Sequence, residues 1–150
     1  PGADRAFEDG VDDCEFDRGR YGSRKEIFWP WSDYGWPGEI FYRNPPTLDR
    51  PTDAAYRVSA IYHPGWWMLT SAAKSLHARN AHQVLGANLE SPARFLLCWT
   101  RDGATEKTCK DTGGSGQAIR IAVAHKIPVW NLARGDHRAL WESFVAGGTP

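Results

Sequence analysis

An apolar run followed by a glycine-rich loop constrains the fold of this chain more than any other feature. Residues 95–100, FLLCWT, show no alternation of apolar and polar positions, which is typical of a strand covered on both faces in a parallel sheet. Residues 112–117, TGGSGQ, lead into a helical pattern that ends near His125, and residues 127–132, IPVWNL, predict a second strand. We therefore expect a strand, loop, helix and strand in succession.

The other elements are predicted from apolar periodicity, helix caps and the positions of Pro and Gly. They are a helix at about 3–17, a strand at 25–30, a long Pro- and Trp-rich excursion at about 31–52, a helix at 53–62 with Asp53 near its cap, a helix at 70–85 capped by Thr70 or Ser71, and a helix from Asp136 through Val145. Strands that alternate with helices imply a mainly parallel sheet. We predict a single Rossmann-like three-layer α/β domain spanning residues 1–150.

The charge and cysteine content exclude several classes of protein. Lys and Arg together number 18, as do Asp and Glu, so a protein that coats duplex nucleic acid is not expected. Three cysteines without a C-x-x-C pair favour neither a disulfide framework nor a zinc site, and the five histidines form no metal-binding pattern. We predict a cytoplasmic protein with no metal, no cofactor and no membrane span.

The glycine-rich loop is the strongest candidate binding site. A helix N-terminus has backbone N–H groups without partners and a partial positive charge, and glycine lets the backbone approach a phosphate closely. The loop lacks the Lys-Ser/Thr of a P-loop and the G-x-G-x-x-G dinucleotide motif, and a flexible strand-to-helix connection is the alternative interpretation. The candidate phosphate-binding residues here are Thr112, Gly113, Gly114, Ser115, Gly116 and Gln117.

Two further groups of residues are candidates for the same site. Arg79, Asn80 and Gln83 continue the apolar stripe of the 70–85 helix and are predicted to face inward. Arg79 could then pair with a phosphate, or it could bind backbone carbonyls or an acid. At the beginning of the chain, Gly2, Ala3 and Asp4 follow Pro1 and form a second candidate loop-to-helix anion corner.

Tryptophan is unusually frequent, with eight residues in the chain. Four of them lie among Pro and Gly outside the periodic segments: Trp29, Trp31, Trp36 and Trp66. Their rings can pin loops onto the body of the domain or form a stacking platform for a base. The sequence favours loop anchoring.

Taken together, the motifs resemble the small phage and prophage proteins of the SLOG superfamily. The resemblance covers nearly the whole chain and rests on PGADRAFE at 1–8, KEIFWP at 25–30, ARNAHQVLG at 78–86, FLLCWT at 95–100, TGGSGQAIR at 112–120 and IPVWNL at 127–132. The superfamily also includes the DNA-processing protein A and the lysine-decarboxylase-like phosphoribohydrolases that activate cytokinins.

The resemblance implies a Rossmann-like sheet that binds nucleotides or nucleotide-derived ligands, as a homodimer or higher oligomer. Residues 2–4 would belong to the first ligand loop of the family and residues 113–116 to the second. Arg79 matches the arginine of the phosphoribohydrolases' Arg-Lys pair, with Asn80 in place of the lysine.

The chain departs from the family pattern in two places. Relatives carry a strand, helix and strand ahead of the corner at 1–4, and this unit is expected to be missing here. The phosphoribohydrolases follow their second glycine motif with catalytic acids, where this chain has Ile119 and Arg120. Without a carboxylate there, glycosidic cleavage lacks its usual acid–base support.

The leading functional prediction is that a phage-type SLOG domain binds a nucleotide or nucleotide-derived phosphate ligand in the bacterial cytoplasm. Three alternatives remain open: a hydrolase that cleaves N-glycosidic bonds of nucleotides, a single-stranded DNA-binding protein, and a non-catalytic component of the phage particle.

Overall fold

The computed structural model describes residues 7, 9–11, 25–34 and 46–147. The predicted corner at Gly2, Ala3 and Asp4, Trp36 and most of the first predicted helix lie outside these residues. Among the described residues, no helix is both long enough and apolar enough to cross a bilayer.

The centre of the described fold is a parallel two-stranded sheet joined by a helix, as the sequence predicted. Strands β1 (Leu96–Cys98) and β2 (Val129–Asn131) pair in parallel with Leu96 opposite Val129, and α4 (Ser115–Ala124) connects them. Both strands are half as long as predicted. Beyond Cys98 the chain leaves the ladder, because the Thr100 N–H donates to the side chain of Asn131, at 3.2 Å, and not to a backbone carbonyl.

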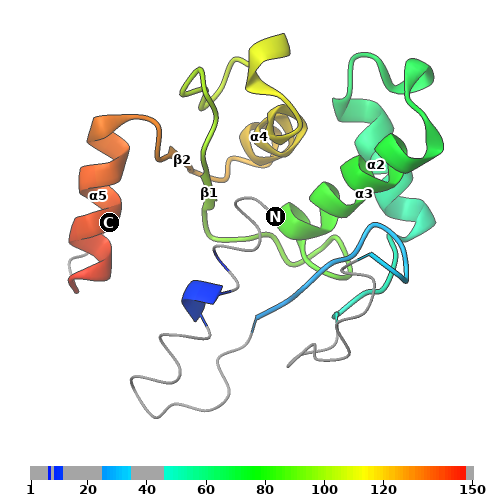
Figure 1. The fold of residues 1–150 in the computed structure, drawn as a ribbon, viewed down its shortest axis with the longest axis horizontal. Helices are drawn as coiled ribbons and strands as arrows, with labels where there is room; N and C mark the ends of the chain where they lie inside the picture. The colour runs from blue at the N-terminus through cyan, green and yellow to red at the C-terminus, as the bar shows by residue number, and fades with distance from the viewer. Residues whose placement is uncertain (1–6, 8, 12–24, 35–45, 148–150) are drawn as a thin grey trace.

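Helices lie on both sides of the sheet (Figure 1), with α4 on one side and α5 (Gly135–Val145) on the other. On the α5 side, the rings of Phe95 and Trp130 stack with their centroids 4.8 Å apart, next to Trp141 and Phe144. The predicted burial of the whole 95–100 run is wrong, because Trp99 is 57% exposed and residues 95–97 are only partly buried.

A pair of helices covers the far side of α4 (Figure 1). They are α2 (Asp53–Tyr62) and α3 (Ser71–Leu85), linked through the short 3-10 helix η1 (Trp66–Met68). The side chain of Thr52, not Asp53, caps α2 by accepting from the Ala55 N–H, and Thr70 caps α3 as predicted. The apolar core between these helices comprises Ala55, Ala78, Ala81, Val84, Leu85, Ala118, Ile121, Ala122 and Ile127.

The segment predicted as a strand at 25–30 forms a single parallel bridge, between Phe28 and Leu48. Phe28 is buried and stacks on the ring of His82, at a centroid distance of 5.5 Å. The His82 ring is fully buried, accepts from the Thr52 N–H and hydrogen-bonds the Gly86 carbonyl. This histidine therefore has a structural role and joins three segments.

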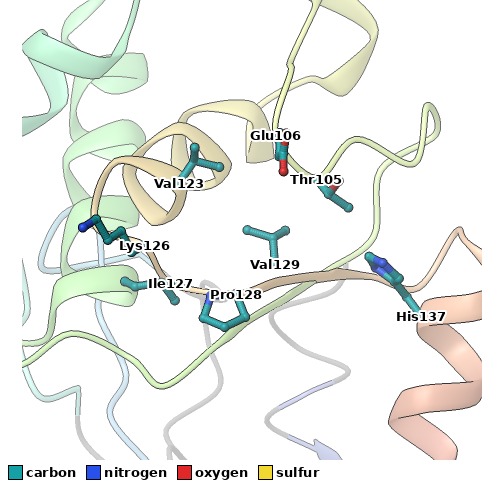
Figure 2. A pocket seen from close by; sticks show the side chains of 8 residues that line it. All are labelled: Thr105, Glu106, Val123, Lys126, Ile127, Pro128, Val129 and His137. Atoms are coloured by element: carbon teal, nitrogen blue, oxygen red, sulfur yellow. The ribbon is translucent and has the colours of Figure 1, made fainter.

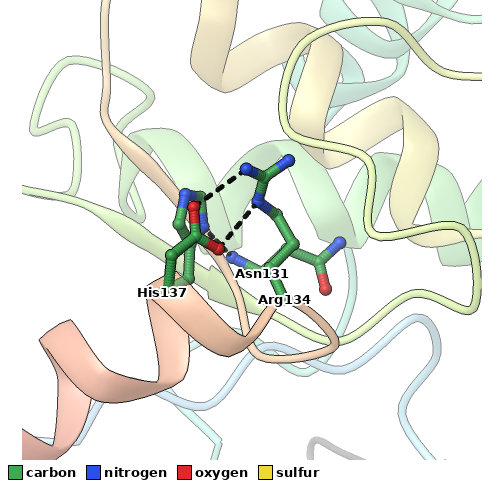
Figure 3. Close-up of polar contacts among 4 residues, drawn as sticks. Asn131, Arg134 and His137 are labelled. Atoms are coloured by element: carbon green, nitrogen blue, oxygen red, sulfur yellow. Dashed lines mark hydrogen bonds and ion pairs between the residues drawn. The ribbon is translucent and has the colours of Figure 1, made fainter.

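At the outer edge of β2, the start of α5 contacts Asn131, the last residue of the strand (Figure 3). The Asn131 N–H donates to His137 Nδ1 at 2.9 Å, and the Arg134 N–H donates to the Asn131 carbonyl at 3.0 Å. Both backbone groups of Asn131 are thus bound and cannot pair with a strand of another chain.

Candidate functional site

The glycine-rich loop runs directly into α4, as predicted. A 3-10 turn, η2 (Lys110–Thr112), precedes Gly113, whose φ of 68° lies in the left-handed region, and Gly114 stands at the N-cap without a side-chain cap. Gly113 and Gly114 are exposed, and a Cβ atom on either would meet no atom within 4 Å. The backbone at this turn is therefore uncovered by the described protein.

The backbone N–H groups at the front of α4 differ in whether they have acceptors. Gly116 donates to the Gly113 carbonyl at 3.1 Å, and Gly113 donates to the Lys110 carbonyl at 3.2 Å. The N–H groups of Gly114, Ser115 and Gln117 donate to no other residue in the described part of the chain. The prediction of unbound amides thus holds for three of the four positions from 114 to 117.

Helix α3 brings Arg79 and Asn80 to this loop. Asn80 is buried, its Nδ2 donates to the Gly114 carbonyl at 3.3 Å, and its Oδ1 accepts from Arg79 Nη2 at 3.2 Å. Gln83 is exposed, so its predicted inward position is wrong. It follows the buried Ala81 by two residues, about 200° around the helix axis, and so lies on the opposite face.

The side chains of Gln117 and Thr112 serve the fold. Gln117 is fully buried, its Oε1 lies 3.0 Å from His77 Nδ1, and its Nε2 donates to the Ser59 carbonyl at 3.5 Å. Thr112 Oγ1 accepts from the Cys109 N–H and donates to Asp102. Of the six predicted loop residues, only Gly113, Gly114 and Ser115 combine exposed or partly exposed positions with proximity to unbound amides.

Asp102 organises the loop and was not singled out from the sequence. Its carboxylate accepts hydrogen bonds from the hydroxyls of Thr112 and Thr100, from the Ala104 N–H and from the Cys109 thiol. These bonds, with the Thr112 hydroxyl first, lower the pKa of Asp102 to about 2. Its place just after a predicted strand was the available signal, because ligands and their organising groups gather at carboxyl ends of strands.

The Asn131 side chain forms hydrogen bonds at the carboxyl ends of both strands. This side chain is fully buried, donates to Thr100 Oγ1 and to the Ala104 carbonyl, and accepts from the N–H groups of Thr100 and Ala133. A ligand between the strand ends would have to replace these bonds.

A hollow of about 390 Å³ lies over β2, between α4 and α5 (Figure 2). It contains none of the predicted ligand residues and lies near the C-terminal end of α4, away from the glycine loop. Its lining residues are Thr105, Glu106, Val123, Lys126, Ile127, Pro128, Val129 and His137.

At the two positions where the family resemblance would place catalytic acids, Ile119 and Arg120 contact other parts of the protein. Ile119 is fully buried, and the Arg120 guanidinium donates to the Tyr62 carbonyl at 2.6 Å and to Thr108 Oγ1. Within the described ranges, no three His, Cys, Asp or Glu residues gather closely enough to hold a metal ion.

Trp31 and Trp66, two of the loop tryptophans that were predicted as anchors, lie against other rings. Trp31 meets Tyr34 edge-on at 4.9 Å, and Trp66 meets the rings of Tyr56 and His63, each at 6.4 Å. These contacts are consistent with anchoring. Trp67, beside Trp66, is 78% exposed.

Comparison with protein families, curated proteins and solved structures found no match for this chain.

Proposed function

We propose that this chain binds a phosphate-bearing, nucleotide-derived ligand at the front of α4, within a Rossmann-like domain of SLOG type. One observation carries the proposal: the N–H groups of Gly114, Ser115 and Gln117 donate to no described acceptor, beside two glycines that no described residue covers. Unbound amides at a helix N-terminus favour an anion both as donors and through the helix dipole.

The side chains around the loop support an anionic ligand. Arg79 is held beside the loop through Asn80, which itself binds the Gly114 carbonyl. The Asp102 carboxylate accepts hydrogen bonds from four donors, and one of these bonds holds Thr112 in place. In this proposal Arg79 neutralises the phosphate and Asn80 positions the loop.

For the hydrolase alternative we consider the carboxylate of Asp102, which hydrogen bonds hold at the loop. A general acid needs a pKa near the working pH, whereas the pKa of Asp102 is about 2. We therefore expect no free base when the protein is incubated with nucleoside monophosphates and the products are separated by chromatography. Base release that disappears in Asp102→Asn would favour the hydrolase over a binding protein.

The binding proposal is tested by isothermal titration with a panel of nucleotides. Gly114 has φ −61° and ψ −29° and open space around its Cβ position, so other residues fit there without strain. Gly114→Asp places a carboxylate among the unbound amides and should abolish binding, whereas Gly114→Asn, of the same size but neutral, should retain part of it. Equal affinities of the two variants, or no binding by the wild type, would overturn the proposal.

A further inference from the structure

Two histidines and an arginine meet beside the first turn of α4, apart from the glycine loop. His63 follows the last residue of α2, His77 lies on α3, and their ring centroids are 4.4 Å apart. Arg120 reaches the same region from α4, where its guanidinium binds the carbonyl of Tyr62, the neighbour of His63. All three side chains belong to partly exposed residues.

This cluster has positive charge without a matching carboxylate. In the part of the chain that the structure describes, no carboxylate forms an ion pair with His63, His77 or Arg120. Burial and the charge of Arg120 lower the pKa of His63. Burial also lowers the pKa of His77, despite its hydrogen bond to Gln117, and the charges of His63, Arg120 and Arg79 act in the same direction.

The groups on the remaining side of the cluster are also cationic or neutral. Trp66 of η1 packs against the His63 ring at 6.4 Å, and the Lys74 ammonium of α3 lies over the Trp66 ring at 5.7 Å. The α4 contribution consists of the Gln117 amide and the Arg120 guanidinium. The cluster therefore faces no negative group from any described element packed against it.

The hydrogen bonds of the two imidazoles favour an anion over a metal ion. His63 Nδ1 accepts from the Gly65 N–H at 3.2 Å, so the proton of the neutral ring resides on Nε2. A metal would need a lone pair at that nitrogen and would be repelled by Arg120. An anion would instead accept the Nε2–H of His63 directly, together with the Nε2–H that His77 gains on protonation, because His77 Nδ1 faces the Gln117 Oε1.

We propose that His63, His77 and Arg120 form a subsite for a tetrahedral oxyanion, such as a phosphate or sulfate group, and that anion binding transfers a proton from solvent to the imidazole of His77. The proposal goes beyond the glycine loop, because it uses none of the backbone amides at residues 114–117. Each imidazolium that forms takes up one proton from solvent.

The affinity of this subsite for an anion should depend on pH. Without an anion, the pKa values of both imidazoles lie below the ordinary value of 6.5, so both rings are neutral at pH 7.5. A bound anion favours the charged form and raises the pKa. The affinity for a given anion therefore increases as the pH falls through the raised pKa. The total increase is about tenfold if the anion raises the pKa of the histidine by one unit.

The first test measures the histidine pKa values of the wild-type protein by NMR, from the Cε1–H signals, with and without sulfate. Sulfate keeps its charge between pH 5 and pH 8, unlike a phosphomonoester, whose second pKa is about 6. We expect sulfate to raise the pKa of His77 by about one pH unit and to leave the pKa of the buried His82 unchanged. Unchanged pKa values of both residues, or an equal rise in both, would overturn the proposal.

The second test compares matched histidine variants in sulfate titrations at pH 5.5 and pH 7.5. His77→Gln keeps a neutral hydrogen-bonding side chain toward Gln117 and should weaken binding at pH 5.5 by about tenfold, whereas His125→Gln, on an exposed position at the end of α4, should match the wild type. Equal losses in both variants would overturn the subsite.

Gly114→Asp separates this subsite from the glycine loop. If the two sites are independent, sulfate should still raise the pKa of His77 in this variant even when nucleotide binding is lost. Loss of that response in Gly114→Asp would overturn an independent subsite. A response that persists in a protein that binds no nucleotide would support the subsite and reject only the proposed function of the loop.

Discussion

The three glycines of the loop should respond differently to alanine, although the sequence motif treats them alike. Gly113 has φ 68° and ψ −153°, a conformation open in practice only to glycine. Alanine at this position has to adopt a strained backbone or displace the turn. We expect Gly113→Ala to lower the free energy of unfolding by about 1–3 kcal/mol.

Gly114 and Gly116 have ordinary helical surroundings. Gly114 has φ −61° and no atom within 4 Å of its Cβ position, so Gly114→Ala should change the free energy of unfolding by less than about 0.5 kcal/mol. At Gly116 a Cβ would lie 3.4 Å from Thr108 and Thr112, which is normal contact. Because the position lies inside α4, Gly116→Ala should stabilise the protein by about 0.5–1 kcal/mol.

Urea denaturation followed by tryptophan fluorescence and by circular dichroism measures these differences. The predicted order of stability is Gly116→Ala, then wild type and Gly114→Ala together, then Gly113→Ala. In a thermal scan, 1 kcal/mol corresponds to about 2–4 °C at this chain length. The reasoning is refuted if Gly113→Ala is as stable as the wild type, or if Gly116→Ala is the least stable of the three.

Three further outcomes follow from buried or hydrogen-bonded polar groups. The pKa of Asp102 is lowered from 3.8 to about 2, so its contribution to stability is complete above pH 4 and is lost as the pH falls toward 2. In thermal scans from pH 5 to pH 2, the melting temperature of Asp102→Asn should therefore decline less than that of the wild type. Asn131→Ala leaves buried partners at Thr100 and Ala104 without bonds and should cost about 3 kcal/mol in urea denaturation, and a cost below about 1 kcal/mol would contradict the role of Asn131. Burial lowers the pKa of His82 below 6.5, so the free energy of unfolding should fall as the pH drops below 6.5; comparison at pH 7.5 and pH 5.5 should show a smaller decrease in His82→Gln.

Local patterns in the sequence determined the order of most described elements. The apolar periodicity of 70–85, its Thr70 cap and the glycines before residue 117 predicted α3 and the start of α4 to within about two residues. These features depend on residues close together in the chain. For the same reason the parallel pairing of β1 and β2 could be inferred, since one helix joins two apolar runs.

Contacts between distant residues were decided only by the tertiary structure. The Asn131 side chain binds Thr100, which lies 31 positions away, and His77 binds Gln117, which lies 40 positions away. Neither pair has a periodic signal, because both depend on how α3, α4 and the strands pack together. The packing also placed Gln83 at the surface and Asn80 against Gly114, two outcomes that the stripe of α3 alone could not separate.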